Sequence, residues 1–116
     1  MECNELTVRE QGGVKEYICG EVSLARLITT GNGTRVLSID VVSTWDMPID
    51  ESVRVGNVQL IYRRDVVNNA RWEFVGYDDG TNRELISIRV FLEGELSDDA
   101  IKELIINVVK TYSRNK

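Results

Sequence analysis

The sequence contains no histidine, and it has only two cysteines and one proline in 116 residues. Without histidine, the chain cannot build a Ser-His-Asp triad, a Cys-His dyad, or a His-ligated zinc or haem site. The two cysteines, Cys3 and Cys19, supply at most half of a tetrahedral zinc site. Any catalysis would have to use carboxylate, lysine, tyrosine, cysteine or arginine side chains.

Positive charge is also scarce, because 14 Lys and Arg residues face 19 Asp and Glu residues and the net charge is −5. A general nucleic-acid-binding protein needs a dominant positive field, so we expect no nucleic-acid partner. Four arginines, at positions 54, 63, 64 and 71, fall in one short stretch. We interpret that stretch as a solvated face.

Long apolar runs are absent. No stretch approaches the roughly 18 apolar residues that a membrane-spanning helix needs, and the N-terminus lacks the pattern of a signal peptide. We therefore expect no membrane insertion and a cytoplasmic location. In that reducing compartment Cys3 is expected to be an exposed free thiol and Cys19 a small buried apolar side chain. A disulfide between the two is the alternative.

What the chain does have is alternation of apolar and polar residues, interrupted by turn signals. Its length and its 42% hydrophobic content fit one folded domain over residues 1–116. Gly31-Asn32-Gly33 and Asp79-Gly80 are typical of hairpin turns. The alternation predicts strands at residues 6–8, 14–19, 22–30, 34–45, 72–77 and 85–92.

Three of these strands have a clear apolar face, because side chains in a strand point alternately to the two sides of the sheet. The residues expected to share a face are Val22, Leu24 and Ile28; Leu37, Ile39, Val41 and Trp45; and Ile86, Ile88, Val90 and Leu92. Ala25 and Leu27 fall on the other face of their strand. One dry face and one wet face are typical of an antiparallel sheet that is covered on one side.

Residues 46–70 fit two structures. Pro48 ends the preceding strand. The β-branched residues between Val53 and Tyr62 favour strands, whereas a helical stripe from Val58 to Val66, with Asn57 as its cap, favours a crossover helix. Both interpretations stay open.

The C-terminal segment predicts an amphipathic helix. Ser97 is a good N-cap, and the carboxylates of Asp98 and Asp99 suit the positive end of the helix dipole. Ile106 and Val109 fall outside the central apolar stripe, so the apolar face is wider than one sheet contact requires. Either this helix is deeply covered by its own domain, or it offers apolar surface to a partner.

The order of parts after residue 68 resembles a known family. Asn-Asn-Ala-Arg-Trp-Glu-Phe leads into a strand, an Asp-Asp-Gly turn and a second strand, and Val-Phe-Leu-Glu-Gly-Glu-Leu-Ser at residues 90–97 then leads into the last helix. Over residues 69–114 this resembles the C-terminal half of the YbjN-like group, which has the fold of type III secretion chaperones. The resemblance implies a small acidic dimer that binds polypeptides, or a regulatory relative, without cofactor or catalysis. The chain departs from that fold in residues 1–13, which show no amphipathic helix.

Together these observations predict an α+β domain, in which an antiparallel sheet of five to seven strands carries the C-terminal helix on one face. A second helix within residues 50–70 is possible. If residues 53–62 are strand instead, a pleckstrin-like arrangement of seven strands capped by one helix is the main alternative.

The predicted function is non-enzymatic protein binding, in a chaperone-like or regulatory role, through an apolar helix or sheet surface. The partner is another protein or a second copy in a homodimer, and no cofactor or metal is expected. The candidate contact residues are Trp45, Ile106 and Val109, flanked by Arg63 and Arg64.

The alternative function is binding of a small molecule or lipid head group in a cleft between helix and sheet. Arg63, Arg64 or Arg71 would hold its anionic group. An enzyme based on carboxylates ranks last. The adjacent pairs at positions 78–79 and 98–99 do not point the same way and are explained by a turn and a helix start.

Overall fold

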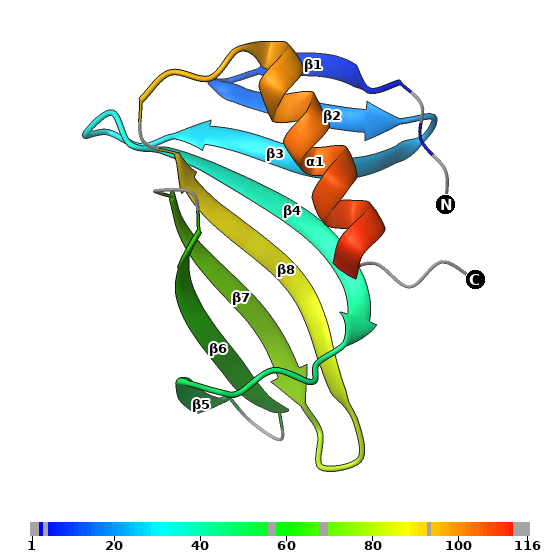
Figure 1. The fold of residues 1–116 in the computed structure, drawn as a ribbon, viewed down its shortest axis with the longest axis vertical. Helices are drawn as coiled ribbons and strands as arrows, with labels where there is room; N and C mark the ends of the chain where they lie inside the picture. The colour runs from blue at the N-terminus through cyan, green and yellow to red at the C-terminus, as the bar shows by residue number, and fades with distance from the viewer. Residues whose placement is uncertain (1–2, 4, 56–57, 68–69, 93, 113–116) are drawn as a thin grey trace.

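The chain folds into one antiparallel sheet with a helix on one side, in a computed structural model that describes residues 3, 5–55, 58–67, 70–92 and 94–112 (Figure 1). The strands are β1 (Thr7–Gln11), β2 (Val14–Cys19), β3 (Val22–Thr29), β4 (Arg35–Thr44), β5 (Glu51–Val55), β6 (Val58–Val67), β7 (Ala70–Asp78) and β8 (Arg83–Leu92). The helix α1 (Asp98–Tyr112) follows them. Within the described residues, no helix combines the length and the apolar character that a membrane crossing requires.

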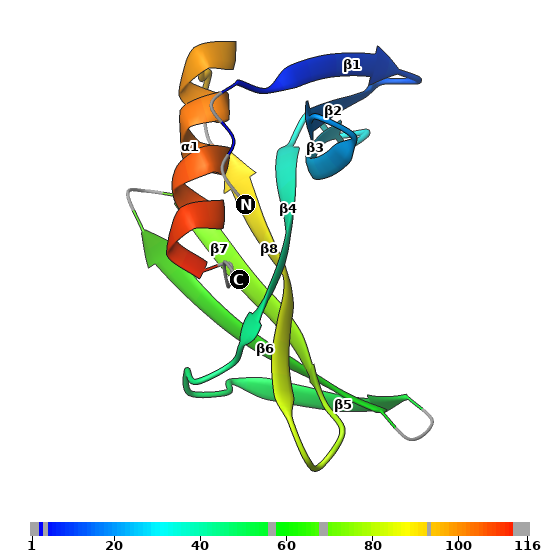
Figure 2. The same cartoon turned by 90° about the vertical axis from the view of Figure 1, so that its right-hand side faces the viewer.

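The sheet joins two meanders of neighbouring strands. The strand order is β1-β2-β3-β4-β8-β7-β6-β5, so β4 and β8 lie side by side at the middle of an eight-stranded sheet. Every pairing is antiparallel. The sheet twists strongly from β1 to β5, and α1 crosses it on one side only (Figures 1 and 2).

This architecture confirms the α+β prediction and corrects two of its details. The expected five to seven strands are eight, one more than a pleckstrin-like arrangement has. The possible second helix in residues 50–70 is wrong, because this region forms β5 and β6. A strand forms here because β6 pairs with β7 along nearly its whole length, from Gln59 opposite Asp78 to Val67 opposite Ala70. A lone helix there would forfeit that ladder of backbone hydrogen bonds.

The core lies between α1 and two adjacent rows of side chains on the sheet. One row contains Ala25, Ile39, Ile88 and Phe74, and the next contains Leu27, Leu37, Val90 and Trp72. All of these residues are buried. The helix covers them with Ile101, Ile105, Val108 and Val109. The expected shared face of Leu37, Ile39, Val41 and Trp45 is confirmed, since all four are buried.

Two other faces were predicted wrongly, because β-bulges shift the alternation. Between β2 and β3 the register moves from Tyr17 opposite Ala25 to Ile18 opposite Ser23, which leaves Leu24 as an extra residue. Leu24 therefore joins the core beside Ala25, whereas Val22 and Ile28 are exposed. A second shift, between β7 and β8, leaves Ile86 as the extra residue. Leu85 is buried in its place.

The end of β7 shows why one glycine is required. Gly76 sits beneath the ring of Trp45, where an added Cβ would lie 3.0 Å from the ring atom Cε3. The same Cβ would overlap the backbone oxygen of Glu84 on β8. Only glycine lets the Trp45 indole and the neighbouring strand approach so closely.

The start of α1 is built as the sequence predicts. The Ser97 hydroxyl accepts a hydrogen bond of 3.1 Å from the Ala100 N–H, which is the geometry of an N-cap. Asp98 and Asp99 occupy the first turn. At the other end, the Tyr112 ring meets the Phe74 ring edge-on, with 5.6 Å between the centroids.

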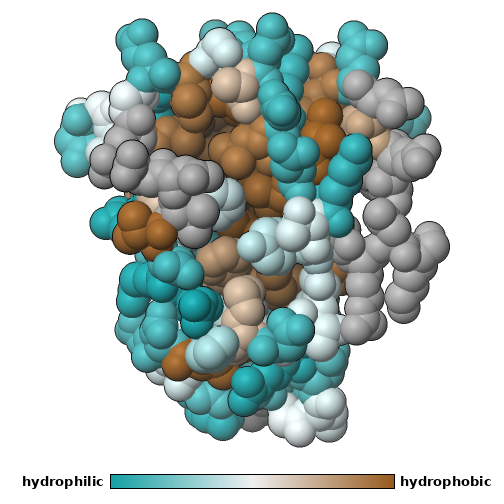
Figure 3. Space-filling view, in the orientation of Figure 1, coloured by the Kyte–Doolittle hydropathy of each residue, from teal (hydrophilic) through white to brown (hydrophobic). Residues whose placement is uncertain are grey.

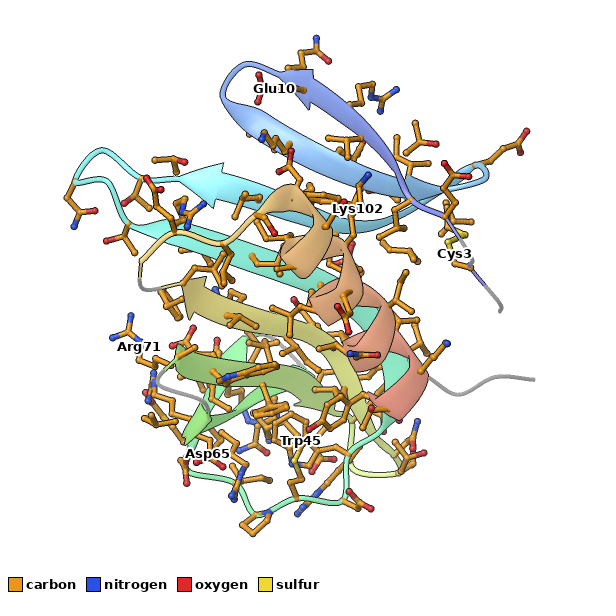
Figure 4. The ribbon with its side chains drawn as sticks, turned by 45° about the horizontal axis from the view of Figure 1, so that its top comes forward. Cys3, Glu10, Trp45, Asp65, Arg71 and Lys102 are labelled. Carbon is orange, nitrogen blue, oxygen red and sulfur yellow. A yellow bond between two sulfur atoms is a disulfide. The ribbon has the colours of Figure 1, made fainter. Side chains whose placement is uncertain are left out.

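The two cysteines form a disulfide, so the prediction of two free thiols is wrong. Cys3 and Cys19 lie with their Cα atoms 6.0 Å apart and are covalently bonded. The bond ties the N-terminal segment to the end of β2, and Figure 4 shows it beside α1. The sequence predicted an exposed Cys3, but nearby Leu6 anchors this segment in the core with 4% of its surface exposed.

Candidate functional site

The side of the sheet opposite α1, which we call the open face, is covered by no other element of the described structure (Figure 2). Residues that lie directly opposite one another on paired strands point to the same side of a sheet. The register therefore defines which side chains gather on the open face, although they come from distant parts of the sequence.

One line of residues on the open face alternates in charge, and we call it the charged row. From β1 to β6, in register, it consists of Arg9, Glu16, Arg26, Ser38, Arg89, Glu73 and Arg64. Its neighbouring charges are opposite in sign everywhere except around Ser38. Opposite charges on facing strands stabilise a sheet, and like charges destabilise it.

Ion pairs connect the members of the charged row. The Glu73 carboxylate forms ion pairs with Arg89 on one side and Arg64 on the other, with 3.3 Å between nitrogen and oxygen in both. Arg64 also reaches Glu51 on the edge strand at 2.8 Å, and these two carboxylates raise the pKa of the arginine. Arg9 donates a hydrogen bond to Glu16, and this contact lowers the pKa of the glutamate, with Ser23 adding to the effect. Ion pairs as exposed as these contribute little to stability, because solvent screens them. The row matters more for the charges that can face it.

A second line of residues on the open face, two positions further along each strand, is apolar, and we call it the apolar row. It consists of Val14, Ile28, Val36, Phe91 and Val66, with Arg71 between the last two. Ile28 is 40% exposed and Val66 is 71% exposed. Single exposed apolar residues are ordinary, but a line of them across five strands is typical of an interaction surface.

The predicted contact residue Trp45 lies elsewhere. Its side chain is 3% exposed and packs in the core. The indole Nε1–H donates a hydrogen bond of 2.8 Å to the carbonyl oxygen of Met47. This buried ring has no surface to offer a partner, so Trp45 has a structural role in the fold.

The wide apolar side of α1 is largely covered by its own domain. Val109 is 8% exposed and Ile106 is half-buried, and both border a narrow gap beside Leu24 and the Cys3 end of the disulfide. No large apolar residue of the helix is fully exposed. Figure 3 shows apolar side chains beside α1, separated by a polar ridge. The first of the two possibilities, a deeply covered helix, describes this arrangement better than a docking helix.

Arg63 and Arg64 do not form one patch, because neighbouring residues of a strand point to opposite sides. Arg64 belongs to the charged row on the open face. Arg63 points to the helix side, opposite Phe74, and pairs with Asp65 at 3.4 Å. Both guanidinium groups are neutralised by carboxylates, so neither is free to hold an anion.

Of the three candidate arginines, Arg71 lines a cleft formed by described residues. The cleft has a volume of about 490 Å³ and is lined by the turn at residues 32–34, Arg71, Phe91, Leu92 and Gly94. It lies at the ends of strands. The sequence had predicted a cleft between helix and sheet. The Arg71 guanidinium stacks on the Phe91 ring at 3.9 Å and has no carboxylate partner among the described residues. Figure 4 shows the Arg71 side chain pointing outward at this end of the sheet.

The adjacent carboxylates have structural roles, as the sequence predicts. Asp79 accepts hydrogen bonds from the Thr81 hydroxyl and from the backbone N–H groups of Thr81 and Asn82, which lower the pKa of Asp79 and fix the hairpin turn. Asp78 pairs with Arg83 at 3.4 Å. Among the described residues, no group of three or more acidic or cysteine side chains is placed to hold a metal ion.

Sequence reasoning missed the apolar row. Its members at positions 14, 28, 36, 66 and 91 share a face only through the strand order and register, which alternation within one strand does not reveal. The available signal was weak: Val36 and Phe91 are apolar residues on the side opposite the predicted apolar face of their strands. Comparison of the chain with protein-family models, curated proteins and solved structures finds no match.

Proposed function

We propose that this chain is a non-enzymatic protein-binding domain and that its contact surface is the open face of the sheet. The observation that carries the proposal is the apolar row, a line of partly exposed apolar residues across five strands beside a row of alternating charges. Protein interfaces commonly combine apolar contacts with neighbouring polar and charged groups.

Of the two predicted contact surfaces, the helix and the sheet, the proposal selects the sheet. The helix side chains that suggested docking are covered, and Trp45 is in the core. A chaperone-like or regulatory role is what the resemblance to the YbjN-like group implies, and it stays a prediction. The cytoplasmic location also stays a prediction, and the disulfide speaks against it, because such bonds are typical of oxidising compartments.

Self-association is the first property to test, because the chain itself is the partner that can always be supplied. Light scattering over a wide range of concentration should give molar masses above the 13.2 kDa of one chain. The variant I28D should return the mass to one chain without lowering the melting temperature, because Ile28 is exposed and its replacement leaves the core intact.

R54E is the matched control, since this exposed residue of β5 points to the helix side of the sheet and should not affect association. A wild type that keeps the mass of one chain at every concentration would contradict the proposal.

The cleft at Arg71 supports a second candidate function, the binding of a small anionic ligand. Its volume of about 490 Å³ is within the usual range of ligand pockets, and Arg71 offers, beside an aromatic ring, a positive charge that no carboxylate of the described residues neutralises. Inorganic phosphate should then raise the melting temperature of the wild type but not of R71A. R54A is the control that should respond like the wild type, and an equal response of R71A would rule out this site.

A further inference from the structure

We propose that a second copy of this chain packs on the open face, with the two copies related by a two-fold axis parallel to β4 and β8. This inference rests on the proposed function and names its partner. The two copies would bury their apolar rows against each other and leave both helices on the outside. Such an interface uses the same surface patch on both subunits.

The strand order makes this symmetry possible. Four strands lie on each side of the boundary between β4 and β8. A two-fold axis along that boundary therefore places β4 over the partner's β8, β3 over the partner's β7, and β2 over the partner's β6. Residues in one row face residues of the same row, because a rotation about an axis along the strands does not move a row along them.

The charged row is complementary to itself under this rotation. Glu16 on β2 meets the partner's Arg64, and Arg26 on β3 meets the partner's Glu73. At the centre, Ser38 meets the partner's Arg89. The symmetry makes each of these contacts twice, and none of them brings like charges together.

The apolar row matches itself in the same way. Val36 meets the partner's Phe91 at the centre, and Val14 meets the partner's Val66 further out. Ile28 meets the partner's Arg71, whose aliphatic stem can cover an apolar side chain while its guanidinium stays on the Phe91 ring. Apolar contacts therefore occupy one end of the interface, where β4 begins and β8 ends, beside the contacts of the charged row.

The charges also exclude the other simple arrangement of two stacked sheets. An axis at right angles to the strands, running along the charged row, would place every residue of the row against its own copy. Arg26 would then face the partner's Arg26, and Glu73 the partner's Glu73. Like charges placed opposite each other oppose association, so the pattern selects the axis along the strands.

Cross-linking between two single-cysteine variants tests this geometry. The native cysteines are bonded to each other, so I28C and R71C each carry one free thiol. Stacked sheets lie about 10 Å apart, and a short bismaleimide spans that gap. A mixture of the two variants should give a covalent dimer.

Neither variant alone should give this product. In the proposed dimer the two copies of residue 28 lie three strand spacings, or about 14 Å, apart along the sheet in addition to the gap between sheets. V53C is the control, because Val53 is an exposed residue of the edge strand β5 and lies several rows away. Its mixture with I28C should give no covalent dimer.

The outcomes separate this inference from the proposed function. A covalent dimer in the mixture of I28C and R71C, and in neither control, supports the two-fold arrangement. If light scattering shows a dimer but this cross-link fails, or if I28C links equally well to itself or to V53C, the arrangement is wrong while the open face remains the contact surface. If light scattering shows only single chains, both proposals are wrong.

Discussion

Removing the disulfide should cost this domain a large part of its stability. The bond joins residues that are 16 positions apart in the sequence. Closing a loop of this length lowers the entropy of the unfolded chain and stabilises the folded state by about 3 kcal/mol. A domain of this size typically has a stability of roughly 5–15 kcal/mol, so the loss should be easily measured.

Urea unfolding of the wild type and of C3A/C19A measures this difference. The variant should unfold at a lower urea concentration, with a free energy of unfolding lower by about 3 kcal/mol. Reduction of the wild type by a dithiol is the control, because it breaks the same bond without changing side-chain volume. Equal stability of the oxidised and reduced protein, within about 0.5 kcal/mol, would refute the argument that the cross-link constrains the chain.

Four further substitutions test the core. G76A should lower the free energy of unfolding by about 1–3 kcal/mol, because its Cβ overlaps the backbone of Glu84; chemical denaturation measures this loss, and no loss would contradict the close strand packing. I105A should lower the free energy of unfolding by about 2–5 kcal/mol, and I106A should lower it clearly less, since Ile105 is fully buried and Ile106 is not. Equal losses in chemical denaturation would contradict this burial. Burial, and then the nearby Asp98, raise the pKa of Tyr17. The free energy of unfolding should therefore be at its full value below pH ~10 and fall as the pH rises further. Thermal unfolding of Y17F should show no such fall.

The neutral-pH behaviour of the same tyrosine variant tests its surroundings. The Tyr17 hydroxyl is buried and has no hydrogen-bond partner among the described residues. Its removal in Y17F should therefore leave the stability unchanged or raise it by about 1 kcal/mol at pH 7. A clear loss in thermal unfolding would show that the hydroxyl is bonded, for example to a buried water.

Local sequence signals predicted the elements well because they act over few residues. The strand at residues 14–19 and the cap at Ser97 depend on alternation and on one hydrogen bond to a nearby amide. The bulges at Leu24 and Ile86 were not predictable, because an extra residue is set by the neighbouring strand and not by the strand itself. Each bulge moves the alternation by one position, which reverses the expected face.

The candidate site depended on information that no local pattern contains. Ile28 lies next to Val36 through the local pairing of β3 with β4. Phe91 joins them only because β4 pairs with β8, a strand far away in the sequence. The same long-range order decided the helix or strand alternative in residues 50–70. Trp45 was misassigned for a similar reason, since its burial depends on the glycine at position 76 of another strand.

The central claim is that the open face of the sheet, and not the helix, is the contact surface. The most direct measurement is the rate of maleimide labelling of a single added thiol at increasing protein concentration. I28C places the thiol on the open face, and E103C places it at an exposed position of α1. We predict that labelling of I28C slows as concentration rises, whereas labelling of E103C stays constant. Slowing at E103C with a constant rate at I28C would contradict the claim.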